Sequence, residues 1–244
     1  MPTIKAALLL VLLLAGPSWA AVAYDADTQA LQNVSLSTKT FSHTTSGSNR
    51  ALLVYVALAG TAQTVSTVTY GGTGLTSLGA LNLTGTPSGR VELWGMVNPA
   101  TGANNVVVTL SATNASWDIS AISFTGAHQT FASCFTGFQS GLNGATNAFV
   151  SLVVTTGQTG DLVSSGTVST TGNGVAPTSP AVQQWLDNSG SSNTMGSTQA
   201  GAASVTLREN WDAFNATNTM GAVAINVAQV SGAAAPVKKR PLFL

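Results

Sequence analysis

Glu92, Asp118 and Glu209 lie in or beside predicted strands, and each has a tryptophan within two positions along the chain. Glycoside hydrolysis needs two carboxyl groups, one as the acid and one as the base or nucleophile. On the concave face of a β-sandwich, acids of this kind would supply both groups. The chain has eight acidic residues in all, so three near tryptophans is weak support. We favour the simpler interpretation that they are isolated solvent-facing acids that keep the protein soluble.

Binding a sugar asks for less than cleaving one, because an aromatic face and a few polar side chains are enough. Two segments have this composition. The ligand-binding candidates are Arg90, Glu92 and Trp94 in the first segment and Glu209, Asn210, Trp211 and Asp212 in the second. The alternative is that both tryptophans are packing residues, since tryptophan is largely buried on average.

Other catalytic and metal-binding patterns are missing from the sequence. Histidine occurs only at positions 43 and 128, and no His-Glu-x-x-His or paired-cysteine spacing for zinc is present. A Gly-x-Ser-x-Gly nucleophile turn is also absent. The sequence therefore predicts no catalytic residues and no cofactor. Calcium prefers oxygen ligands, so Asp25 with Asp27, or Asp212 with loop carbonyls, are its only candidates.

The first 20 residues match a secretory signal peptide. Lys5 is followed by an apolar run over 6–15 and then by small residues up to Ala20. A run of this length is too short for a bilayer, which takes about 20 residues. We expect cleavage after Ala20, or after Ala23 as the second choice, with a secreted or cell-surface location and no transmembrane segment in the mature chain. Cys134 is the only cysteine, which excludes an internal disulfide.

Charge is sparse, at 7% of residues, and three of the eight basic residues stand together at 238–240. The rest of the chain is mildly acidic and gives no electrostatic footprint for nucleic acid. We expect a β-sandwich domain over 21–232 and a basic C-terminal tail over 233–244.

The element that organises the domain is Ala51–Ala59, an apolar run that follows the turn at 46–50. Such a run is typical of a strand buried on both faces. Further strands are predicted at 65–70, 75–83, 90–97, 106–111, 117–125 and 220–230, and 40–44 alternates threonine or serine with larger side chains. Roughly ten to thirteen short strands without an amphipathic helix predict an all-β fold. We expect a single antiparallel two-sheet sandwich of jelly-roll type.

Some segments of the second half are harder to assign. We expect Phe149–Thr156 and Asp161–Ser169 to form a hairpin, and residues 181–187 to be either one helical turn or a short strand. The stretches 126–147 and 170–201 are expected to be loops at the sandwich ends. No repeat is regular enough to indicate a solenoid or a propeller.

Several strings resemble a module of exported, surface and phage-associated bacterial proteins of mostly unassigned function. They are Ser46–Val54, Val68–Gly72, Arg90–Trp94 and Asn98–Val108, and they follow one another in the same order. The similarity covers roughly 22–230. It implies a β-sandwich and carries over no catalytic residue.

Three functions are therefore open. The first is an exported, non-catalytic β-sandwich that presents a binding surface, as an adhesive, carbohydrate-binding or envelope component, with a glycan or surface polymer as partner. The second is a structural subunit of a virion or surface appendage that forms homo-oligomers through sheet edges. The third is a glycan-cleaving enzyme that uses Glu92, Asp118 or Glu209.

Overall fold

The computed structural model describes residues 21–32, 35–143, 149–155, 157–169, 175–178, 180–187, 193–211 and 219–230. The expected signal peptide at 1–20 and the expected basic tail at 233–244 lie outside these ranges. Within them the chain is almost entirely β-strand, and its one helix, α1 (Phe131–Cys134), has four residues. No helix of the described part is long and apolar enough to cross a membrane. The prediction of an all-β antiparallel fold is confirmed.

The first half of the chain forms two sheets. Sheet I contains, in spatial order, β1 (Ala23–Gln32), β9 (Trp117–Thr125), β3 (Ala51–Ala59), β7 (Gly89–Val97) and β6 (Thr76–Leu83). Sheet II contains β2 (Leu36–Thr45), β8 (Gly102–Asn114), β4 (Val65–Tyr70) and β5 (Thr73–Gly74).

The second half forms two more sheets. Sheet III contains β10 (Phe135–Leu142), β17 (Met220–Val227), β12 (Leu162–Ser169), β15 (Asn193–Ala200) and β14 (Val182–Asp187). Sheet IV contains β11 (Phe149–Val154), β16 (Val205–Trp211) and β13 (Val175–Pro177).

Each half has the strand order of a jelly roll, in which nested antiparallel pairs wrap into two facing sheets. In the first half, β1 pairs with β9, β2 with β8, β3 with β7 and β4 with β5. In the second half, β10 pairs with β17, β11 with β16 and β12 with β15. The jelly-roll topology agrees with the sequence prediction, but the described strands form two jelly rolls in succession and four sheets in place of two.

The two halves can be aligned residue by residue through their pairing. Leu53 pairs with Ile122 in sheet I, and Ser164 pairs with Ile225 in sheet III. An alanine precedes each of these isoleucines. Matching the two pairs places Leu53 and Ser164 at equivalent positions. The strands β8 and β16 align in the same way through the Gly-Ala-x-x-Val strings that start at Gly102 and Gly201.

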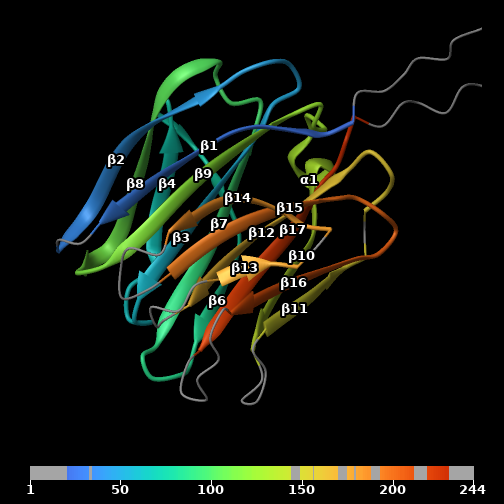
Figure 1. Cartoon of the computed structure of the whole chain (residues 1–244). Coiled ribbons are helices and arrows are strands. Elements are labelled where there is room, and N and C mark those ends of the chain that lie inside the picture. The colour runs from blue at the N-terminus through green and yellow to red at the C-terminus, as the bar shows by residue number, and fades with distance from the viewer. Residues whose placement is uncertain are drawn as a thin grey trace, which may run out of the picture.

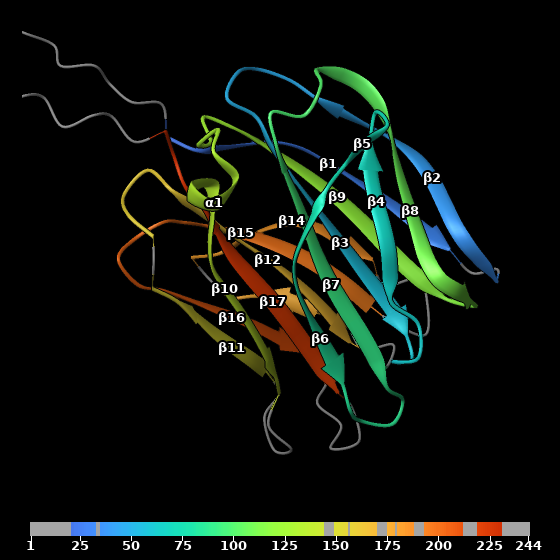
Figure 2. The ribbon, with the colours of Figure 1, turned by 180° about the vertical axis from the view of Figure 1, so that it is seen from behind.

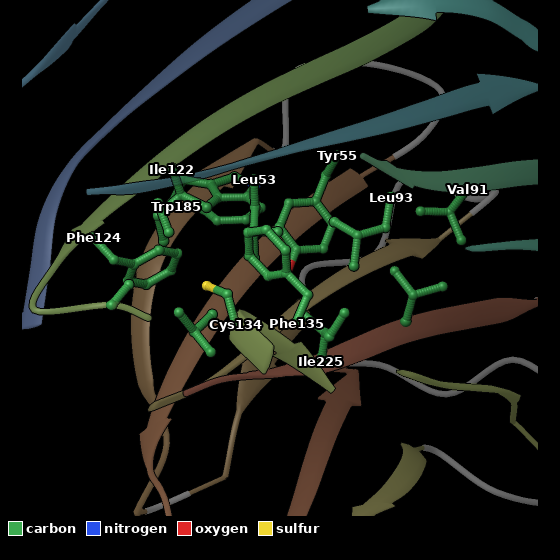
Figure 3. Close-up of a cluster of buried hydrophobic side chains, with 14 of the residues drawn as sticks. Leu53, Tyr55, Val91, Leu93, Ile122, Phe124, Cys134, Phe135, Trp185 and Ile225 are labelled. Carbon is green, nitrogen blue, oxygen red and sulfur yellow. The ribbon is translucent and has the colours of Figure 1, made fainter. Parts of the chain in front are cut away.

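The four sheets stack in the order II, I, III, IV, with an apolar layer between each neighbouring pair. One cluster joins sheets II and I, a second joins sheets I and III, and a third joins sheets III and IV. Figures 1 and 2 show the blue-to-green strands of the first half on one side and the yellow-to-red strands of the second half on the other. Figure 3 shows the middle layer, where Tyr55 and Leu93 of sheet I meet Trp185 and Ile225 of sheet III. The middle layer therefore holds the two jelly rolls together.

The strand β3 is buried on both faces, as the sequence predicts. Its even-numbered residues Leu52, Val54, Val56 and Leu58 lie in the layer against sheet II, whereas Leu53 and its odd-numbered neighbours lie in the layer against sheet III. The uninterrupted apolar run follows from this position, because each side of the strand faces a different core.

The turn before β3 is fixed by Arg50. Its guanidinium donates hydrogen bonds to the carbonyls of Pro99 (2.8 Å) and Gly47 (2.7 Å) and to Oδ1 of Asn98 (3.2 Å). Two of the turn strings noted in the sequence are therefore in contact, and both are structural.

Several assignments in the second half are wrong. The strands β11 and β12 form no hairpin, because β11 pairs with β16 in sheet IV and β12 lies between β15 and β17 in sheet III. The stretches expected to be loops contain β10, β13, β14 and β15. The residues 182–187, left open between a helical turn and a strand, form the edge strand β14. β10 and β13 pair with β17 and β16, which lie far away in the chain, so local patterns do not reveal them.

Candidate functional site

The first predicted site, on β7, is an internal anchor. Glu92 is 4% exposed, and its Oε1 accepts hydrogen bonds from Arg90 Nε at 2.7 Å and from the backbone N–H of Val65 at 2.9 Å. Its Oε2 accepts from the indole N–H of Trp94 at 3.3 Å. Arg90 also donates to Oδ1 of Asn82 at 2.7 Å. These contacts join β7 to the start of β4. Both oxygens of the Glu92 carboxylate therefore accept hydrogen bonds from other residues of the fold.

The second predicted site, on β16, is divided by the alternation of the strand. Glu209 points into the layer between sheets III and IV and is 1% exposed. Asn210 points the other way and donates to Thr178 Oγ1 at 2.6 Å. Trp211 ends β16 opposite Val175, but its side chain lies outside the described part, as does Asp212 altogether.

Glu209 forms a buried polar cluster with two serines. Its Oε1 accepts hydrogen bonds from Ser165 Oγ at 2.7 Å and Ser197 Oγ at 2.9 Å, and the two hydroxyls lie 2.8 Å apart. Oε2 is buried without a hydrogen-bond partner among the described residues. Burial raises the pKa of Glu209, and the two serine hydrogen bonds oppose that rise only in part.

The three acids proposed for glycan cleavage lie in three different layers. Glu92 lies between sheets I and II, Asp118 between sheets I and III, and Glu209 between sheets III and IV. Two of them cannot act on the same bond, because a packed sheet separates each from the next.

The calcium candidates at the start of β1, Asp25 and Asp27, accept hydrogen bonds from the turn at Ser46 and from a tyrosine. Asp25 accepts hydrogen bonds from the backbone N–H and the hydroxyl of Ser46 and from Ser123 Oγ. Asp27 accepts from the hydroxyl of Tyr24 at 2.5 Å. Burial raises the pKa of Asp25, but the hydrogen bonds outweigh it and the net shift is downward. Across the described ranges, no group of three or more His, Cys, Asp or Glu side chains is placed to hold a metal ion.

One pair of buried acids interacts through its charges between the two jelly rolls. Asp118 of β9 and Asp187 of β14 are both buried, and Asp118 lines a cavity of about 10 Å³ with Tyr55 and Trp185. Burial, and secondly the charge of Asp187, raise the pKa of Asp118 to about 7. The cavity has room for about one water molecule and none for a sugar. The pair can store a proton, but it has no space for a substrate. Sequence reasoning missed Asp187, because nothing local joins β14 to β9.

The outer surface of sheet II is the most regular exposed feature of the described residues. We call it the hydroxyl face. It consists of alternate residues of three neighbouring strands, namely Thr38, Thr40, Ser42, Thr44, Thr67, Thr69, Asn105, Val107 and Thr109. None of these side chains is charged, and the alternates between them, which are buried or, at Lys39 and Phe41, half-buried, lie on the opposite face of the strands.

Pairing places the threonines of the hydroxyl face in rows. Thr109 of β8 lies opposite both Thr38 of β2 and Thr67 of β4. In the next row Val107 lies opposite both Thr40 and Thr69. Neighbouring strands are about 4.8 Å apart and successive outward residues about 6.7 Å apart. The result is a regular grid of hydroxyl and methyl groups. The alternation at 40–44 was visible in the sequence, but the partners on β8 and β4 were not.

Comparison of the chain with family models, with curated proteins and with solved structures finds no match.

Proposed function

We propose that the chain is an exported, non-catalytic binding protein whose hydroxyl face binds a neutral polysaccharide. The observation that carries the proposal is the uncharged grid formed by the rows at Thr109 and Val107. Hydroxyl groups donate and accept hydrogen bonds with sugar hydroxyls, and the threonine methyls offer apolar contact to sugar C–H groups.

Absence of charge on this surface favours a neutral partner. A charged side chain would keep its own hydration shell or attract counter-ions, whereas threonine loses little when a neutral polymer covers it. The extent of the grid over three neighbouring strands favours an extended or insoluble polymer over a small sugar, because small ligands need a concave pocket.

The test is retention of the protein on insoluble neutral polysaccharides such as cellulose and chitin. In the double variant Thr40→Lys/Thr69→Lys, two charges stand in one row of the hydroxyl face, and we expect retention to fall at least tenfold. The matched control is Thr206→Lys, an exposed threonine on the outer surface of sheet IV, which should retain the wild-type behaviour. Failure of the wild type to bind any neutral polysaccharide would overturn the proposal, and so would equal retention of the double variant.

A second function, a self-assembling structural subunit, is supported by the edge of sheet III. β14 pairs only with β15 among the described strands, and Val182 at its start is 59% exposed. Unpaired strand edges with exposed apolar residues promote association. Light scattering of the purified protein tests this function: a defined oligomer or filament supports it, and a monomer at high concentration removes it.

A further inference from the structure

A groove of about 500 Å³ lies where the first described residues, Ala21 and Val22, meet sheet III. Its walls are mainly apolar and include Val22, Leu162, Pro180, Val182 and Ala200. Val182 has the largest exposed fraction among the large hydrophobic residues of the described part. The volume falls within the range of about 300–1,000 Å³ that is usual for binding pockets.

The described chain ends at the rim of this groove. Gln229 donates its backbone N–H to Asp161 Oδ1 at 2.9 Å and its side-chain Nε2 to the Thr159 carbonyl at 2.8 Å. Thr159 and Asp161 both line the groove. Val230, the last described residue, donates its N–H to the Gly126 carbonyl at 3.2 Å. The last described residues therefore lie at the rim of the groove.

The sequence after Val230 has a suitable composition for the groove. It ends in Pro241-Leu242-Phe243-Leu244, which is wholly apolar and follows three basic residues. A chain can extend by about 3.3 Å per residue, so residue 242 can reach about 40 Å from residue 230. The groove is well within that distance.

We propose that residues 241–244 bind in this groove of their own chain, as an extended segment beside β14. An added segment would supply N–H donors to the edge of sheet III and apolar side chains to the groove, as in other cases where a peptide extends a sheet. Attachment to the same chain favours this occupant over a second copy, because a short tether gives an effective concentration in the millimolar range.

Carboxypeptidase digestion of the full chain tests the proposal. We expect release of Leu244 and Phe243 from the wild type to be at least tenfold slower than from Val182→Glu, which places a charge in the groove. Val153→Glu is the matched control, since Val153 is a similarly exposed valine on the outer surface of sheet IV, and its release should match the wild type. Ala200→Glu, a second charge in the groove, should reproduce the effect of Val182→Glu and guards against a folding defect in either variant.

Dilution of the protein distinguishes the two possible sources of the segment. Slow release that persists on hundredfold dilution supports binding within one chain. Slow release that disappears on dilution, together with a dimer in light scattering, would assign the groove to the segment of a second copy and overturn the proposal. Equal release from the wild type and both groove variants would also overturn it.

Discussion

Tyr55 packs against Gly166, the residue at its own position in the second jelly roll. Tyr55 is two residues after Leu53 and Gly166 two residues after Ser164, and those two are equivalent by pairing. A Cβ added at Gly166 would overlap the tyrosine ring. The Tyr55 hydroxyl donates to Ser164 Oγ at 3.0 Å. The contact between the two halves thus depends on an asymmetry between them, with a large residue on one side and a glycine on the other.

Gly166→Ala should therefore weaken the contact between the two jelly rolls. The new methyl group has to displace a fully buried tyrosine, and overpacking of this kind costs about 1–3 kcal/mol. Chemical denaturation measures the free energy of unfolding. Gly74→Ala is the control: no atom lies within 4 Å of its added Cβ, and we expect a change below about 0.5 kcal/mol. Equal effects of the two substitutions would contradict the packing role of Gly166.

Protonation of Asp118 should make the protein more stable at pH 4–5 than at pH 7–8. Burial and the charge of Asp187 raise the pKa of Asp118 from 3.8 to about 7. Between these values the folded state holds a proton that the unfolded state has released, so the free energy of unfolding falls as pH rises. The full effect is about 4 kcal/mol, at about 1.4 kcal/mol per pKa unit.

The measurement is unfolding free energy against pH for the wild type and Asp118→Asn, which mimics the protonated side chain. We expect the difference between the two proteins to grow from pH 4 to pH 7 in favour of the variant. Burial lowers the pKa of His43, so its titration makes the free energy of unfolding rise with pH, opposite to the effect of Asp118. Both proteins contain His43, and subtracting one curve from the other removes its contribution. Parallel curves would show that Asp118 does not titrate in this range.

Glu209 occupies the position in the second jelly roll that Leu110 has in the first, eight residues after the matched glycine. Its partners Ser165 and Ser197 pair with each other, as Val54 and Trp94 do at the matched place in sheet I. One half therefore has an apolar layer where the other has an acid and two serines. Burial raises the pKa of Glu209, so its ionisation opposes folding.

Glu209→Gln should raise the free energy of unfolding at pH 8 and leave it nearly unchanged at pH 4. At low pH both the folded and the unfolded state carry the neutral acid, which resembles glutamine. At high pH the unfolded state is ionised, whereas folding requires burial of the charge or retention of the proton. Thermal and chemical denaturation at the two pH values test this expectation. Destabilisation by Glu209→Gln at pH 8 would mean that the charge itself is stabilised, for example by a bound cation.

Local patterns predicted the strands of the first half well. The apolar run of β3 and the alternation of β7 show in the sequence because each strand faces a core with large residues. The same approach failed for β15, where Asn193–Thr198 are buried although most are small and polar. Gly196 lies under the ring of Trp185, and Ser197 bonds to Glu209. Both causes come from other strands, so the sequence of β15 looked like a loop.

The correspondence between the two jelly rolls and the surroundings of the candidate site residues could not be predicted, for a similar reason. The halves share strand order, but matched positions differ in kind, as Leu110 and Glu209 do. Arg90, Glu92 and Trp94 are alternate residues of the predicted strand at 90–97, so they share one face of β7. Whether that face meets solvent or another sheet depends on β4, which the local pattern of β7 does not contain. The pairing of Asp118 with Asp187 likewise depends on how sheets I and III pack.

Glu92→Ala should unfold the first jelly roll more easily without altering its hydroxyl face. The substitution removes the acceptor for Val65 N–H and leaves Arg90 without its carboxylate partner. Loss of one partner of a buried ion pair costs about 3–5 kcal/mol. Glu92→Gln keeps an acceptor oxygen for Val65 and should lose less. Denaturation measures both variants, and retention on polysaccharide is measured on the folded protein below its melting temperature. Normal stability of Glu92→Ala combined with lost retention would restore Glu92 as a ligand-binding residue and move the binding site from the hydroxyl face to β7.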